Sequence, residues 1–237
     1  MALNLAECLA LTAEQYPARI AAVLEEVQLS YRDLADAARR VANGLTGMGL
    51  VPGDRVAVML PNTPHFPMVY YGVLWAGLTV IPMNPTLRRR EIVFQLRDSG
   101  AKALFVWQEM AEEAVAAFVE VDGCAHLVQV EAGREASQPK EGVSFCRLVS
   151  AASQRFDMVQ TQPTDTAVIM YTAAELGTPR GAMLSHFSLF MNALVVKEYV
   201  LHYTPEDVFL AALPLFHSFG QSTMMNAPFL AGARVVF

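Results

Sequence analysis

Charged residues are scarce in this chain of 237 residues, at 17% of the composition against 54% hydrophobic residues. Such a composition excludes a disordered chain, because disorder requires low hydrophobicity and high charge. The net charge is −6 and the isoelectric point is near 5.4. These values argue against a nucleic-acid partner, since affinity for a phosphate backbone needs clustered lysine and arginine. Any anionic ligand therefore has to be held by a local site.

Cysteine is also rare. Cys8, Cys124 and Cys146 are odd in number and show neither CxxC nor Cys/His spacing, which favours buried reduced thiols over a disulfide framework or a zinc site. Residues 1–17 lack a basic segment and carry Glu7 within their apolar part, so they predict an amphipathic helix rather than a secretory signal. We expect a cytoplasmic protein and assign no metal ligands.

Two uncharged runs, 66–85 and 213–233, are long enough to span a bilayer. Both contain internal glycine or proline residues and polar side chains, which divide each run into shorter elements typical of a helix and a strand. We therefore predict no transmembrane span, and peripheral contact with a membrane surface stays open.

Apolar runs rich in β-branched residues alternate with helix-like segments along most of the chain. The strand-like runs begin at Arg55, Leu78, Ala103, His126, Ala167 and Val208, and the helix-like segments cover 30–49, 64–76, 88–99, 109–120 and 188–200. This alternation indicates an α/β fold with parallel sheet flanked by helices.

The polar stretch 153–165 is typical of a linker. We expect a first α/β subdomain at 1–164 and the beginning of a second at 165–237. The last residues, from Arg234 to Phe237, indicate the opening of a buried strand. Because the backbone groups of such a strand need partners, the sequence predicts that the chain is a fragment of a longer protein.

The stretch MYTAAELGTPRGAMLSH, residues 170–186, lies between an apolar run and a helix-like segment. A loop rich in glycine and hydroxyl side chains can wrap a polyphosphate, because exposed backbone N–H groups and hydroxyls donate to its oxygens. The loop does not match GxxxxGK[ST], so it is not a P-loop of that kind. Its candidate ligand-binding residues are Thr172, Glu175, Gly177, Thr178, Arg180 and Gly181.

The segment YTAAELGTPRG, residues 171–181, resembles the signature loop of the adenylate-forming acyl-CoA synthetases and related ligases, approximately YTSGTTGxPKG, without a gap. Further segments that resemble this family, in the same order, begin at Gly53, Gly72, Phe94, Gly181 and Leu213. The resemblance covers nearly the whole chain and is closest to the fatty-acid members. It implies the N-terminal domain of an adenylate-forming enzyme.

The resemblance also implies a reaction. A carboxylate attacks the α-phosphorus of ATP to give an acyl-adenylate and pyrophosphate, and a thiol, usually that of coenzyme A, then displaces AMP. The implied partners are a hydrophobic carboxylic acid, ATP and coenzyme A, with Mg²⁺ accompanying the nucleotide, and a homodimer is compatible with this assignment. In LPLFHSFG, residues 213–220, the resemblance places His217 near the acyl carboxylate, where its imidazole can donate to the developing anion.

Ser218, Phe219 and Gly220 complete the substrate-binding stretch implied by the resemblance. Apolar side chains follow it, and both an acyl tunnel and helical core packing explain them equally well. These side chains are Phe219, Met224, Met225, Phe229 and Leu230.

The signature loop departs from the family pattern, because Ala173, Ala174, Glu175 and Leu176 replace its Ser, Gly, Thr and Thr. A carboxylate about 4 Å from a phosphate oxygen costs on the order of several kcal/mol at an effective dielectric constant near 20. Arg180 stands where the family has its own cation, so it adds no compensating charge. Either Glu175 turns outward and the loop still binds phosphates, or the fold is retained and the phosphate site is lost.

Later family elements have no match in the chain, including a YGxTE-like segment, the Asp that holds the ribose and the C-terminal domain with its catalytic Lys. We therefore do not expect this chain alone to complete the reaction. Two alternatives stay open: a ligase that loads acyl groups onto a carrier protein, and a non-catalytic relative that binds acyl ligands or a partner.

If the signature loop is impaired by its substitutions, Glu175→Thr combined with Ala174→Gly should raise ATP affinity by about tenfold or more, because it removes a repulsive carboxylate. Calorimetric titration with Mg-ATP measures this change. An unchanged dissociation constant would contradict this account of the loop.

Overall fold

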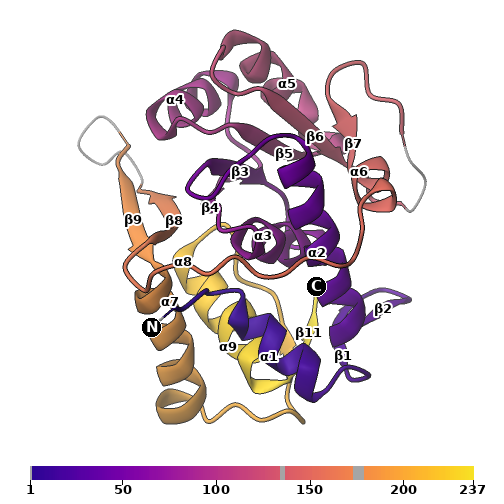
Figure 1. Cartoon of the computed structure of the whole chain (residues 1–237), viewed down its shortest axis with the longest axis vertical. Helices are drawn as coiled ribbons and strands as arrows, with labels where there is room; N and C mark the ends of the chain where they lie inside the picture. The colour runs from indigo at the N-terminus through magenta and orange to yellow at the C-terminus, as the bar shows by residue number, and fades with distance from the viewer. Residues whose placement is uncertain (1, 134–136, 173–178) are drawn as a thin grey trace.

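The computed structural model describes residues 2–133, 137–172 and 179–237, which form two sheets surrounded by helices (Figure 1). The helices are α1 (Glu7–Gln15), α2 (Tyr31–Gly47), α3 (His65–Trp75), α4 (Arg89–Ser99), α5 (Ala111–Glu120), α6 (Phe145–Ala151), α7 (His186–Val195), α8 (Ser218–Gln221) and α9 (Ala227–Ala231), with the 3₁₀ turn η1 (Gln108–Met110) and the π-helical turns η2 (Val196–Val200) and η3 (Ser222–Asn226). The strands are β1 (Ile20–Leu24), β2 (Val27–Ser30), β3 (Arg55–Met59), β4 (Thr79–Pro82), β5 (Ala103–Trp107), β6 (His126–Val130), β7 (Val143–Ser144), β8 (Thr166–Tyr171), β9 (Gly181–Ser185), β10 (Val208–Leu210) and β11 (Arg234–Val236).

The larger sheet has the strand order β7-β6-β5-β3-β4-β8-β9, and all its neighbouring pairs are parallel except β8 with β9. Successive side chains of its central strands point alternately into two hydrophobic cores. Val56 and Val58 contribute to the core that includes α2 and α3, whereas Ala57 and Met59 contribute to the core that includes α4 and α5. Figure 1 shows these two helix pairs on different sides of the sheet. The predicted α/β fold with helix-flanked parallel sheet is confirmed.

The smaller sheet has the order β10-β11-β1-β2. Strand β11 is parallel to both of its neighbours, with Val235 opposite Ala22 on one side and opposite Phe209 on the other. A strand was expected here and is confirmed, and β1 and β10 flank it and pair with its backbone. The hairpin of β1 and β2 was not predicted, since its strands are short.

The two sheets take strands from both parts of the chain. β8 and β9 join the larger sheet, while β1 and β2 join the smaller sheet that also contains β10 and β11. The division into 1–164 and 165–237 stays a prediction, and the sheets do not follow it.

Helix α2 begins and ends as its sequence predicts. The Ser30 hydroxyl accepts a hydrogen bond from the Asp33 N–H at 3.1 Å, and the Asp33 carboxylate accepts from the Ser30 N–H at 3.0 Å, which forms a capping box. Gly49, with a φ of 91°, follows the helix. The buried face packs so closely on α3 that a Cβ at Gly72 would lie 2.6 Å from the Val41 Cβ.

The N-terminal segment is fixed by polar contacts to distant parts of the chain. The Asn4 amide donates to the Leu74 carbonyl at 2.8 Å and the Val159 carbonyl at 3.1 Å. The Leu5 N–H donates to Nδ1 of His186 at 2.9 Å. These bonds hold the start of the chain against α3 and α7, and the predicted first helix, α1, is confirmed.

The two uncharged runs fold as short elements. The first contains α3 and β4, and the second contains α8, η3 and α9. No helix in the described ranges combines the length and apolar character of a membrane span.

The pH dependence of stability should report on His186. Burial lowers the pKa of His186 to about 4, partly opposed by Asp165. In the unfolded chain the His186 imidazole takes up a proton near pH 6.5. The free energy of unfolding should therefore decrease by about 3 kcal/mol as the pH falls from above 6.5 to 4. His186→Gln keeps an acceptor for the Leu5 N–H and removes this titration, so its urea-unfolding free energy should fall less steeply over this interval. Burial also lowers the pKa of His65, which leaves a residual slope in both proteins. Equal slopes would contradict the assignment.

Candidate functional site

The larger sheet contains a point where successive crossovers leave in opposite directions. After β3 the chain crosses into α3 on one face, and after the neighbouring β4 it crosses into α4 on the other face. The loops 60–64 and 83–88 therefore diverge at the carboxyl ends of two adjacent parallel strands. Ligands of open α/β sheets bind in the crevice at such a point, so this edge is the candidate functional site.

Asn62 brings a distant segment to this edge. Its amide donates to the Ala211 carbonyl at 2.6 Å and the Leu213 carbonyl at 2.8 Å, and its Oδ1 accepts from the Leu215 N–H at 2.9 Å. An asparagine in a turn commonly bonds to local backbone, but Asn62 binds backbone about 150 residues further along the chain. Asn84 does bond locally, because its Oδ1 accepts from the backbone N–H and the hydroxyl of Thr86.

The segment held by Asn62 leads directly into the predicted substrate-binding stretch. His217 precedes α8, with its N–H donating to the Pro214 carbonyl at 3.1 Å and its carbonyl accepting from the Gln221 N–H at 3.0 Å. The His217 side chain is exposed and makes no capping bond to α8. Ser218 and Phe219 are also exposed, and 64% of Phe219 is accessible.

Gly220 differs from its three neighbours, because it is buried. A Cβ at this position would lie 2.2 Å from the Pro214 carbonyl oxygen. Gly220 therefore allows α8 to pack directly on the turn that carries His217.

The described residues of the predicted phosphate stretch belong to the hairpin of β8 and β9. The stretch 170–186 lies between a strand and a helix as expected, but strand β9 within it was not predicted. At the mouth of the hairpin the Thr172 N–H donates to the Arg180 carbonyl at 3.0 Å. Both residues are exposed, and Gly181 pairs with Tyr171. The predicted ligands Glu175, Gly177 and Thr178 lie outside the described residues.

The N-terminus of α7 is far from the mouth of this hairpin along β9. Ser185 caps α7 by accepting from the Ser188 N–H at 3.1 Å. Ser185 pairs with Thr166, at the amino end of β8. The positive end of the α7 dipole, which acts only near the first turn, therefore faces the opposite edge from Thr172 and Arg180.

The hairpin mouth and the Asn62 contacts share one edge of the sheet. Strands β3, β4 and β8 are consecutive and parallel, with Val58 opposite Pro82 and Val80 opposite Val168. Two strand spacings separate β3 from β8, or about 10 Å. The structure thus brings Thr172, Arg180 and the His217 segment to one side of the molecule.

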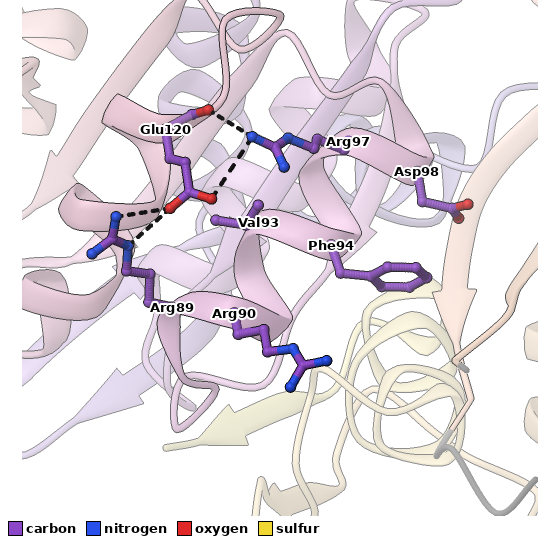
Figure 2. Close-up of a pocket in the computed structure, with 7 residues that line it drawn as sticks. All are labelled: Arg89, Arg90, Val93, Phe94, Arg97, Asp98 and Glu120. Atoms are coloured by element: carbon purple, nitrogen blue, oxygen red, sulfur yellow. Dashed lines mark hydrogen bonds and ion pairs between the residues drawn. The ribbon is translucent and has the colours of Figure 1, made fainter. Parts of the chain in front are cut away.

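Helix α4 is anchored to the end of β8 through Phe94 and Asp98, whose side chains are drawn in Figure 2. The Tyr171 hydroxyl donates to the Asp98 carboxylate at 2.6 Å, and the Phe94 and Tyr171 rings are 6.3 Å apart. Burial, together with the Asp98 carboxylate, raises the pKa of Tyr171. The neutral hydroxyl is therefore the donor that fixes the last residue of β8.

An open groove of about 770 Å³ runs beside α4 and α5. Arg89 contacts the Glu120 carboxylate at 2.8 Å, and Arg97 donates to the Glu120 carbonyl at 3.0 Å, while Arg90 points away from Glu120 (Figure 2). Exposed ion pairs of this kind contribute little to stability. The groove lies on the outer face of the helices and does not include His217 or Thr172.

A family model described as AMP-binding enzyme matches residues 9–237. The chain belongs to the AMP-binding enzyme family. It is 32% identical over 216 residues to a long-chain-fatty-acid–CoA ligase of Salmonella typhimurium, covering 81% of this chain and 38% of the relative. It is 26% identical over 226 residues to a 4-coumarate–CoA ligase of Vanilla planifolia, covering 93% of this chain and 40% of the relative.

Solved structures of adenylate-forming ligases have the same fold. Apo MatB from Rhodopseudomonas palustris is 28% identical, with a TM-score of 0.87 over 100% of this chain and 45% of that chain. An anthranilate CoA ligase, AuaEII, in complex with anthranoyl-AMP has a TM-score of 0.93 at 21% identity, again over 100% of this chain and 45% of the other. The chain thus spans 38% to 45% of the length of these relatives.

The resemblance found in the sequence is therefore confirmed: this is a member of the adenylate-forming acyl- and aryl-CoA ligase family. Sequence inspection alone missed the contact between Asn62 and 211–215 and the anchoring of Tyr171 by Asp98. Neither contact has a local signal, because the partners are separated by 149 and 73 residues along the chain.

Replacing Gly220 should disrupt the His217 turn of this AMP-binding domain. The added methyl group of Gly220→Ala would overlap the Pro214 carbonyl, which should destabilise the fold by about 1–3 kcal/mol. Gly47→Ala, at the end of α2, meets no atom within 4 Å and should be neutral or stabilising by up to about 1 kcal/mol. Denaturant unfolding compares the two variants, and equal stabilities would contradict the packing argument.

Proposed function

We propose that this chain provides the nucleotide- and acid-binding edge of an AMP-forming acyl-CoA ligase that activates a hydrophobic carboxylic acid. The observation that supports this proposal most is the shared edge of the larger sheet. There the exposed hairpin mouth at Thr172 and Arg180 follows β8, and the segment that presents the exposed His217 is bound by Asn62 after β3, two strand spacings or about 10 Å from β8. A ligand with phosphates at one end and an acyl group at the other can bridge that distance.

The hairpin mouth is suited to the phosphates of ATP. Arg180 provides a permanently charged guanidinium with several N–H donors, and Thr172 adds a hydroxyl. Both are exposed at the mouth, on either side of the loop. Glu175, Gly177 and Thr178 are proposed phosphate neighbours from the sequence alone, and Gly181 follows Arg180 as the first residue of β9.

The proposed reaction has two steps. A carboxylate oxygen of the acid attacks the α-phosphorus of ATP, an oxygen–phosphorus bond forms, and the bond to the leaving pyrophosphate breaks. The thiol of coenzyme A then attacks the acyl carbonyl, a thioester forms, and AMP leaves with the electrons of the broken bond. His217 contributes a ring N–H that can donate to the carboxylate and the adenylate, while Ser218 and Phe219 border the acid.

Mg²⁺ accompanies ATP in the proposed reaction, yet the described residues do not fit a resident magnesium site. Within 2–133, 137–172 and 179–237, no group of three or more His, Cys, Asp and Glu side chains is placed to hold a metal ion. We assign no step to a metal ligand of this chain.

The apolar residues after His217 suggest where an acyl group lies. Met225 and Phe229 are fully buried in the core, so they are packing residues. Phe219 is exposed, and Met224 and Leu230 are partly buried. We propose that these three residues border the acyl chain.

The curated relatives favour a coenzyme A ligase over the two alternatives. Two of these relatives are named as CoA ligases for a long-chain fatty acid and for 4-coumarate. The binding-module alternative rests on Ala173–Leu176, which lie outside the described residues. A cytoplasmic location, a homodimer and peripheral membrane contact stay predictions.

The proposed function is tested by pyrophosphate release. The polypeptide encoded by the complete reading frame that contains this sequence should release pyrophosphate from Mg-ATP in the presence of hydrophobic acids of one chain-length class. Adding coenzyme A or an acyl-carrier protein identifies the acceptor, because only the true acceptor converts the adenylate to a thioester.

Arg180→Ala should raise the KM for ATP by about tenfold, since one charge-assisted contact to phosphate is lost. Arg32→Ala removes an exposed arginine of α2 and should change neither KM nor kcat. A folded protein that releases no pyrophosphate with any acid would overturn the proposed function and favour the acyl-binding alternative.

A further inference from the structure

We propose that Asn62 is a positioning residue that sets the backbone from which His217 is presented to the substrate. The inference rests on the proposed function of His217 and extends it to a residue of a loop that follows the other sheet's strand β3. Asn62 follows β3 in the larger sheet, whereas His217 follows β10 in the smaller sheet.

The Asn62 side chain is fully engaged by one segment. An asparagine amide has two N–H donors and one carbonyl acceptor. Both donors are used, at 2.6 Å to the Ala211 carbonyl and 2.8 Å to the Leu213 carbonyl. The acceptor takes the Leu215 N–H at 2.9 Å. Three contacts to alternate residues fix both the position and the direction of 211–215.

The fixed segment determines the position of His217. Leu215 is fully buried, and the His217 N–H is bonded to the Pro214 carbonyl. On its other side the same turn is covered by Gly220, which leaves no room for a side chain. The backbone of His217 is therefore held between the Asn62 contacts and α8, while its imidazole stays exposed. A shift of 211–215 has to move the imidazole.

Only an amide satisfies these three contacts. The carboxylate of Asn62→Asp would face the Ala211 and Leu213 carbonyl oxygens without a hydrogen, so attraction becomes repulsion at two positions. Asn84 provides a matched control on the neighbouring loop. Its oxygen only accepts, from the backbone N–H and the hydroxyl of Thr86, and a carboxylate in Asn84→Asp accepts equally well.

The first experiment does not need activity. The chain has five histidines, and the C2–H signal of His217 is assigned by its loss in His217→Gln. Asn62→Asp should shift this signal, whereas Asn84→Asp should leave it unchanged. If circular dichroism shows that Asn62→Asp does not fold, Asn62→Ser removes the same contacts without adding a charge. An unchanged His217 signal in the folded variant would overturn the proposal.

The second experiment uses pyrophosphate release by the full-length protein. Asn62→Asp should lower kcat by about 10- to 100-fold, because small displacements of a reacting group are costly, with less than about a twofold change in the KM for ATP. In a His217→Ala background the same substitution should have little further effect, since both changes act through one group. Losses that multiply independently would show a merely structural role and overturn the proposal.

The two experiments separate the possible failures. If the unsubstituted full-length protein releases no pyrophosphate, the proposed function fails, and the His217 signal still decides whether Asn62 positions that residue. If pyrophosphate is released and Asn62→Asp leaves the C2–H signal of His217 unchanged, the proposed function is supported and the positioning role of Asn62 is wrong.

Discussion

Burial of the central parallel strands on both faces is the constraint from which the rest of the structure follows. Val56 and Val58 face one core, and Ala57 and Met59 face the other. Parallel neighbours need a crossover after each strand, and the crossovers must cover both faces to bury such a sheet. The helices after β3 and β4 consequently leave in opposite directions, and the divergence of the loops 60–64 and 83–88 is a product of this burial.

Long-range hydrogen bonds from side chains to backbone hold the parts of the molecule together. Tyr31 donates to the Ala233 carbonyl at 2.6 Å beside the smaller sheet, and Thr12 of α1 donates to the Phe229 carbonyl of α9 at 2.7 Å. The Asn62 contacts join the loop after β3 of the larger sheet to the segment after β10 of the smaller one. Losing one partner of such a buried bond costs about 1–3 kcal/mol, because the remaining group stays unsatisfied. The Asn62 connection between the sheets is therefore specific as well as stabilising, and it brings the segment of His217 to the edge where β3 ends.

The hairpin of β8 and β9 changes the expected origin of phosphate affinity. In many α/β proteins a helix N-terminus contributes its dipole to an anion. Here β9 carries the chain back, and α7 begins beside Asp165, whose carbonyl accepts from the His186 N–H. In the proposed function, anion affinity at the mouth therefore has to come from Arg180, Thr172 and the loop between them. The composition of that loop then matters more than it would beside a helix dipole.

The sequence by itself determined the family, the α/β class, the capping of α2 by Ser30 and Asp33, and most strands and helices of the larger sheet. These features are local patterns of hydrophobicity, capping and motif order, so neighbouring residues suffice to specify them. Only the tertiary structure decided that β11 pairs with β1 and β10, and that Asn62 binds 211–215. It also decided which apolar residues after His217 are core and which are exposed. These outcomes depend on contacts between residues far apart in the chain, and an amide or a methionine carries no local sign of its distant partner.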